Sequence, residues 1–115
     1  MVVSNMKLER IRKRKMLNID SYINLLVDIL NCAEKEKSAI LNGEITQWSL
    51  EEIESIIIPE ISELLLYAKN GKVYFKYGKK QRLLASTYLM TDSKDLFHTI
   101  LGAKISNLQE LYNTL

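Results

Sequence analysis

The chain has 115 residues, about the size of one ordinary domain; 47% of them are hydrophobic and 26% are charged. This composition excludes an intrinsically disordered chain and supplies enough apolar side chains for one hydrophobic core. The net charge of +2 is too small, taken as a total, to indicate an acidic or a basic partner.

The cysteine content and the N-terminus suggest a compartment. Cys32 is the single cysteine, which excludes an intramolecular disulfide and predicts a reducing, cytoplasmic location. The basic residues near the N-terminus end at Lys15, and polar residues interrupt the sequence that follows. A signal peptide needs an apolar run of roughly 7–15 residues, and a membrane span needs about 18 or more. The sequence therefore predicts neither.

The first segment differs in composition from the rest of the chain. Residues 1–16 are polar and strongly basic, whereas an ordinary globular pattern begins at residue 17. We therefore divide the chain into a basic arm, residues 1–16, and a single helical domain, residues 17–115. An arm that binds a partner and an arm that is merely solvated or disordered are both compatible with this composition.

The clearest predicted helix follows the arm. A buried stripe is expected because apolar residues recur at steps of three and four, and polar residues recur with the same spacing on the opposite face. Asn18 or Asp20 is the expected cap at its start, and Asn42-Gly43 is the expected stop. The predicted stripe is Ile19, Ile23, Leu26, Leu30 and Ala33.

A second helix is predicted to begin at a capping box, in which Ser49 is the N-cap and Glu52 lies three residues on. Its expected apolar face is Leu50, Ile53, Ile57, Ile61, Leu64 and Ala68. Pro59 falls inside this pattern and predicts a kink or a break near Ile58, because proline removes a backbone donor and clashes with the preceding turn. Asn70-Gly71 is the expected end.

The region 72–90 fits two interpretations. Residues 72–77 are rich in strand-favouring types, whereas 81–90 match both an alternating and a helical pattern. A short β-hairpin near residues 72–85 and a strand-like loop leading into a helix are both compatible with it. We favour the loop and helix, because an isolated two-stranded hairpin is marginally stable.

The last segment predicts a helix after the capping cluster Thr91-Asp92-Ser93. Its apolar face is expected to be Leu101, Ile105, Leu108, Tyr112 and Leu115. Gly102 marks either a break in this helix or a place where another helix approaches closely. The whole pattern predicts a mainly α fold, a small bundle of three to four helices.

Charge is distributed unevenly along the chain. Residues 1–16 carry six basic residues against one acidic residue, a net charge of +5. Residues 17–66 carry two basic against ten acidic residues, a net charge of −8, and residues 67–91 carry six basic residues and no acidic one. The predicted contacts with a polyanion or an acidic partner are Arg10, Arg12, Lys13, Arg14, Lys15, Lys72, Lys76, Lys79, Lys80 and Arg82.

Block 67–91 has a second interpretation. Its aromatic residues could stack on unpaired bases beside the cations, as single-strand binding proteins do. They could equally be core residues, with the lysines solvating the outside and the acidic stretch 17–66 neutralising them. We favour this second interpretation for the block. The aromatic residues are Tyr67, Tyr74, Phe75, Tyr77 and Tyr88.

Residues suited to catalysis are few. His98 is the single histidine and is expected to be half-buried and hydrogen-bonded, and Cys32 is expected to behave as a small hydrophobe within its helix. One histidine and one cysteine cannot form a four-ligand zinc site, and no phosphate-binding glycine motif is present. An enzyme would need a pocket around His98, Tyr88 and Ser86. We expect no enzymatic activity, no cofactor or metal, and no small-molecule substrate.

Two functions remain. The first is a non-catalytic protein-interaction or regulatory domain, self-associating or neutralising a partner as immunity proteins do. The second is nucleic-acid binding through the basic arm and block 67–91. The connection 42–49 is too long for a helix-turn-helix motif, whose turn has about 3–4 residues, so we rank nucleic-acid binding second.

Overall fold

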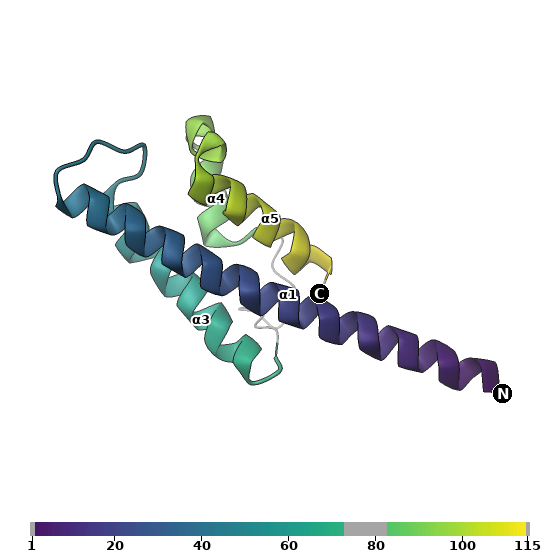
Figure 1. Ribbon diagram of the computed structural model, residues 1–115. Helices are drawn as coiled ribbons and strands as arrows, with labels where there is room; N and C mark the ends of the chain where they lie inside the picture. Colours follow the sequence, from purple (N-terminus) through teal and green to yellow (C-terminus); the bar gives the residue numbers. More distant parts are fainter. Residues whose placement is uncertain (1, 73–82, 115) are drawn as a thin grey trace.

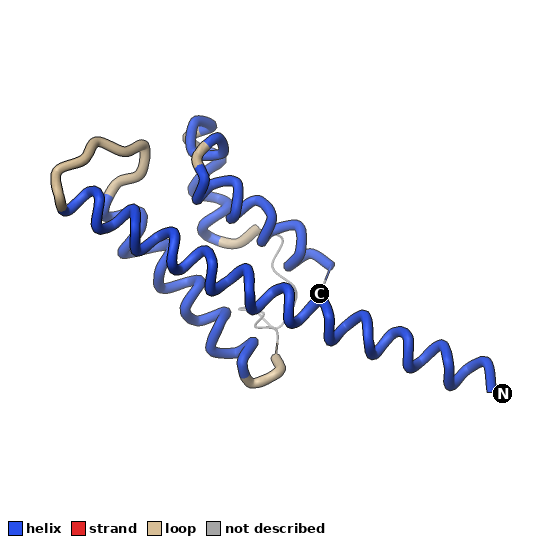
Figure 2. Tube along the Cα trace, in the orientation of Figure 1, coloured by secondary structure: helices blue, strands red, loops and turns tan. Residues whose placement is uncertain are grey.

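The computed structural model describes the backbone of residues 2–72 and 83–114, and within these ranges the side chains from Ile19 onward. The described residues form helices joined by loops, which confirms the predicted mainly α bundle (Figure 2). The elements are α1 (Val2–Leu41), α2 (Leu50–Glu52), the π-helical turn η1 (Ile53–Ile57), α3 (Ile58–Lys69), α4 (Ala85–Thr91), the 3-10 helix η2 (Lys94–His98) and α5 (Ile100–Thr114).

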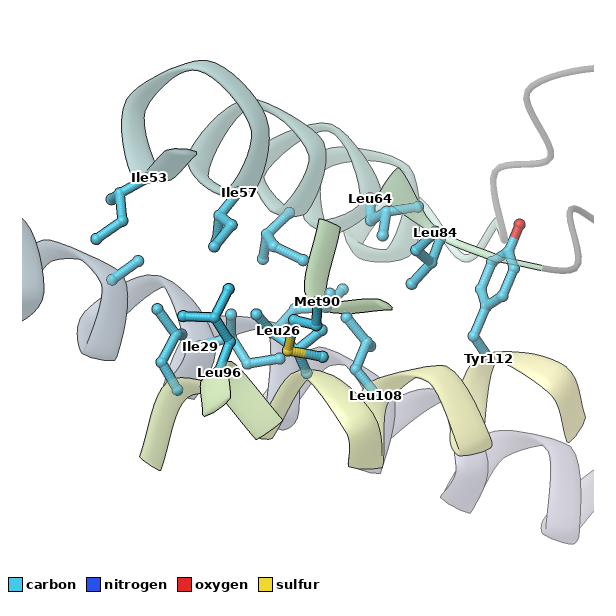
Figure 3. Packing of buried hydrophobic residues seen from close by; sticks show 14 of the residues in the cluster. Leu26, Ile29, Ile53, Ile57, Leu64, Leu84, Met90, Leu96, Leu108 and Tyr112 are labelled. Atoms are coloured by element: carbon cyan, nitrogen blue, oxygen red, sulfur yellow. The ribbon is translucent and has the colours of Figure 1, made fainter. Parts of the chain in front are cut away.

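The long helix α1 is the axis around which the bundle is built. Helices α3 and α5 both pack against α1 and run antiparallel to it (Figure 1). Helix α4 packs against α5, η1 and η2. Figure 3 shows the apolar side chains of α1, α3, α4 and α5 meeting in one core. The fully buried members include Leu26, Ile29, Ile53, Ile57, Ile61, Met90, Leu96, Leu101, Ile105 and Leu108.

Helix α1 differs from its predicted form at its start. The predicted cap at Asn18 or Asp20 is wrong, because the helix continues without a break to Val2. The predicted stop is confirmed, since α1 ends at Leu41 and Gly43 adopts a φ of +86°. The division between arm and domain at residue 16 stays a prediction, and no change of secondary structure marks it.

The buried face of α1 is rotated from the predicted one. Tyr22, Leu26, Ile29 and Ala33 are fully buried, whereas the predicted Ile19, Ile23 and Leu30 are only partly buried. The prediction is therefore confirmed at Leu26 and Ala33. Two helices, α3 and α5, cover α1, so the centre of its buried face lies between them, and the other three predicted residues lie along one margin. Burial raises the pKa of the Tyr22 hydroxyl, and nearby Tyr112 and Glu60 raise it further.

The predicted capping box at Ser49 is confirmed. The Ser49 hydroxyl accepts from the Glu52 amide at 3.1 Å, and the Glu52 carboxylate accepts from the Ser49 amide at 2.8 Å. The predicted apolar face is buried from Ile53 to Ala68, with Leu50 partly buried. The helix then ends at Lys69, and Gly71 has the positive φ of +74° expected of a helix stop.

The predicted kink near Ile58 takes the form of the π-helical turn η1. The Ile58 amide bonds the Ile53 carbonyl five residues back, and Pro59 lies in the first turn of α3. Proline has no amide donor, and in a regular α-helix its ring would clash with the carbonyl of residue 55, four residues back. The wider turn therefore lets Ile53, Ile57 and Ile61 all stay buried in one core.

Helix α4 is held at its start by side chains from two other helices. The Glu60 carboxylate of α3 accepts from the amides of Ala85 and Ser86 at 2.7 and 2.9 Å. The Gln109 carboxamide oxygen of α5 accepts from the Leu84 amide at 2.8 Å. The helical part of the favoured prediction for 81–90 is confirmed from Ala85 onward, while the strand-like part and most of the proposed hairpin lie outside the described residues.

The C-terminal helix begins later than predicted. The cluster Thr91-Asp92-Ser93 precedes the short helix η2, and Thr99 caps α5 by accepting from the Gly102 amide at 2.9 Å. The close-approach interpretation of Gly102 is confirmed, because an added Cβ would overlap the Leu96 carbonyl oxygen. The predicted face is buried at Leu101, Ile105, Leu108 and Tyr112, and the predicted Leu115 lies outside the described residues.

Candidate polyanion-binding surface

The basic arm forms the first part of α1. Figure 1 shows α1 continuing past the ends of α3 and α5, so that residues 2–16 project from the bundle. The protein measures 63 × 24 × 23 Å along its principal axes. A helix of 40 residues is about 60 Å long at 1.5 Å per residue, so α1 alone accounts for the long dimension.

The start of the second basic block lies at the end of the bundle from which the arm projects. Because α3 is antiparallel to α1, its C-terminal end faces the arm (Figure 1). Lys69 is the last residue of α3, Lys72 follows the Gly71 turn, and both are exposed. The second described range begins at Leu83, and the amide of the next residue, Leu84, donates to Gln109 in the C-terminal half of α5.

Six of the ten predicted contacts can therefore be placed. Arg10, Arg12, Lys13, Arg14 and Lys15 lie on the projecting part of α1, and Lys72 lies beside the end of α3. The remaining four lie outside the described residues: Lys76, Lys79, Lys80 and Arg82. Lys69 was left out of the predicted contacts, although it belongs to the basic block 67–91.

The acidic stretch 17–66 has partners of its own. Asp28 pairs with Lys104 of α5, and Glu54 pairs with Lys37 of α1 at 3.2 Å. Two further carboxylates, Glu52 and Glu60, accept from backbone amides at helix starts. Among the described side chains, no ion pair joins this stretch to block 67–91, so the predicted mutual neutralisation is not seen at Lys69 or Lys72.

The aromatic residues of block 67–91 are only partly described. Tyr67 is 37% exposed and Tyr88 is 62% exposed, so neither is a core residue as the favoured interpretation had it. They lie on different helices, α3 and α4. The other three, Tyr74, Phe75 and Tyr77, lie outside the described residues.

The residues considered for catalysis point in different directions. Ser86 is fully buried, whereas Tyr88, two residues along α4, is exposed. His98 is exposed on η2, so its predicted half-buried position is wrong. The short helix η2 buries Leu96 and partly buries Phe97, which leaves the next residue on the outside.

Cys32 behaves as predicted for a small hydrophobic side chain. It is partly buried against the core, and burial raises the pKa of its thiol, partly offset by Lys104. Within the described side chains, no three histidine, cysteine, aspartate or glutamate residues gather into a metal-binding group. None of the described helices combines the length and the apolar character needed to cross a bilayer.

Comparison with protein-family models, with curated proteins and with solved structures finds no match to this chain.

Proposed function

We propose that this protein is a non-catalytic interaction module that binds an acidic macromolecule through its basic arm. One observation carries the proposal: α1 is a single helix whose projecting part has six basic residues and one acidic residue. Like charges brought together raise the local potential and attract an oppositely charged partner. The described end of block 67–91 adds Lys69 and Lys72 beside the arm.

The continuity of α1 supports a binding role over a merely solvated arm. An isolated helix of about 15 residues is marginal in water. Growth of the arm from a helix already anchored by Tyr22, Leu26 and Ile29 avoids the cost of helix nucleation. The bundle thus presents the arm at a fixed angle, which lowers the ordering cost of binding.

The location we propose for this module is the cytoplasm. Cys32 is free and is the only cysteine of the chain, as is usual in a reducing compartment.

A second candidate function is protein docking at the opposite end of the bundle. Leu41, Ile45 and Ile100 are 63%, 101% and 74% exposed, and they lie where α1 ends and α5 begins. The hydrogen bond from the Trp48 indole to Thr99 ties these two regions together at 3.1 Å. A regulatory domain that neutralises a protein partner could use such apolar residues. In that case the arm would not contribute to binding.

The proposal is tested by the salt needed to elute the protein from immobilised heparin, a generic polyanion. The variant R12A/K15A should elute at a clearly lower salt concentration, because each lost contact removes the gain from one counterion release. The matched control is K35A/K94A, which removes the same charge from exposed positions outside the arm. The control should elute close to the unmodified protein.

Equal losses in both variants would show that only the total charge matters and would contradict a specific role for the arm. An unmodified protein that passes through heparin at low salt would contradict the proposal as a whole.

A further inference from the structure

The end of the bundle opposite the arm carries exposed apolar side chains. Helix α1 ends here and α5 begins here, because the two helices run antiparallel (Figure 1). Leu41, Ile45 and Ile100 are all largely exposed at this place. Large apolar residues that gather on a surface mark a site of interaction. We call this surface, formed by residues 37–54 and 91–100, the far end.

The far end also carries a net negative charge. It has six acidic residues against two basic ones, Lys37 and Lys94, a net charge of −4. Glu54 pairs with Lys37, and the Glu52 carboxylate takes part in the capping box. The other four acidic residues are exposed and make no ion pair or side-chain hydrogen bond within the described part of the chain: Glu44, Glu51, Asp92 and Asp95.

The charge of the far end decides which partners fit it. A polyanion is repelled by the four free carboxylates. The far end of a second copy is repelled as well, because a symmetric end-to-end contact would place a net charge of −4 against another of −4. The far end therefore fits a partner that is basic and partly apolar.

The chain contains such a partner at its other end. Residues 1–16 have a net charge of +5, and their sequence includes apolar residues such as Leu8 and Ile11. Lys69 and Lys72 are exposed at the end of the bundle from which these residues project (Figure 1). The two ends of the 63 Å long axis thus carry opposite charge. Complementary charge of this kind steers two surfaces together and suppresses other pairings.

The two ends cannot meet within one molecule. Helix α1 is continuous from Val2 to Leu41, and the part from Met16 to Leu41 holds the arm about 38 Å from the far end at 1.5 Å per residue. A contact between an arm and a far end must therefore join two copies of the chain.

We propose that the basic arm of one copy docks on the far end of a second copy. Leu41, Ile45 and Ile100 supply the apolar part of this surface, and its four free carboxylates supply the opposite charge. Because each copy has one arm and one far end, the contact is head-to-tail and joins copies into open chains or rings. The inference goes beyond the proposed function but uses the same arm, so a second copy and an acidic macromolecule compete for it.

Sedimentation velocity of the full chain tests the contact. Over concentrations from about 5 to 200 μM, the protein should form oligomers in about 0.05 M salt and return to monomers in about 0.5 M salt, because salt screens charges at exposed surfaces.

Two charge-reversal variants identify the surfaces that meet. E44K/D95K changes the far end, and R12E/K15E changes the arm. Each variant alone should associate at least about tenfold more weakly than the unmodified protein, because it lacks one of the two charged surfaces. An equimolar mixture should associate again, since the arm of E44K/D95K meets the unmodified far end of R12E/K15E. The mixture should stop at pairs, because the opposite contact is lost.

The matched control is E34K/E63K, which reverses two exposed glutamates outside the far end and should associate as the unmodified protein does. Equal losses in this control, or no recovery in the mixture, would overturn the inference. Association that survives R12E/K15E would overturn it too, and would place another surface on the far end. An unmodified protein that stays monomeric in low salt would also overturn it, whereas retention on heparin tests the proposed function separately.

Discussion

Glu60 holds the start of α4 although it lies on a different helix. Its carboxylate accepts from the amides of Ala85 and Ser86, which are 25 and 26 residues away along the chain. A negative charge at a helix start also interacts favourably with the helix dipole. A single side chain of α3 therefore fixes the position of the start of α4.

Substitution of Glu60 by glutamine should lower the free energy of unfolding by about 1–2 kcal/mol. The amide replaces one acceptor oxygen by a donor, so two backbone amides compete for a single oxygen and the charge is lost. Thermal or urea unfolding followed by circular dichroism measures the change.

Glu63→Gln is the matched control, because Glu63 is an exposed glutamate on the same helix. Its effect should stay within about 0.5 kcal/mol. Equal effects at the two positions would mean that the Glu60 contacts contribute nothing to stability.

The contrast between two helix caps shows which residue-scale contacts can be predicted from a sequence. The reciprocal bonds of Ser49 and Glu52 are local, so the spacing of three residues was enough to predict them. The bonds of Glu60 and Gln109 to the start of α4 join distant segments, and no local spacing indicates them. The predicted burial of His98 was wrong for the same reason, because the exposure of this side chain depends on which side of η2 packs on the core.

At the scale of elements, helix α1 sets the geometry of the candidate site. Its stop at Asn42-Gly43 was predictable, because glycine allows the left-handed backbone that ends a helix. Its start was not, since Asn18 and Asp20 are residues that favour a cap yet lie within the helix. Capping preference is a weak signal where the flanking residues, here mainly Lys, Arg, Leu and Met, are themselves good helix formers.

The importance of this continuity is tested by Met16→Pro. Proline at this position clashes with the carbonyl of Arg12 and interrupts α1 between the arm and the bundle. Affinity for heparin should fall about tenfold, because the arm loses its fixed direction while every charge is retained. The bundle should unfold at an unchanged temperature, since proline is tolerated at the first turn of the remaining helix.

Met16→Ala is the control, and it should bind heparin as the unmodified protein does. A Met16→Pro variant with unchanged affinity would show that the arm acts as a flexible charged tail instead of a rigid helix.

For the whole molecule, the central feature is that a basic arm projects from a bundle in which several acidic residues already bind lysines or backbone amides. The sequence showed the unequal charge blocks and the helical class, because both are properties of local composition and spacing. It could not show that the arm extends α1 beyond the bundle, or that Lys69 and Lys72 lie at the same end. Those facts depend on how α3 and α5 pack against α1.

Hydrogen exchange of the arm's backbone amides with and without heparin tests most directly whether the projecting part of α1 is the binding element. Without heparin the amides of residues 5–16 should exchange much faster than those of the buried part of α1, around Leu26 and Ile29. With saturating heparin we predict that exchange slows at least about tenfold throughout residues 5–16, while the bundle changes little. Unchanged exchange in the arm, or protection confined to the bundle, would contradict the claim that the projecting part of α1 is the binding element.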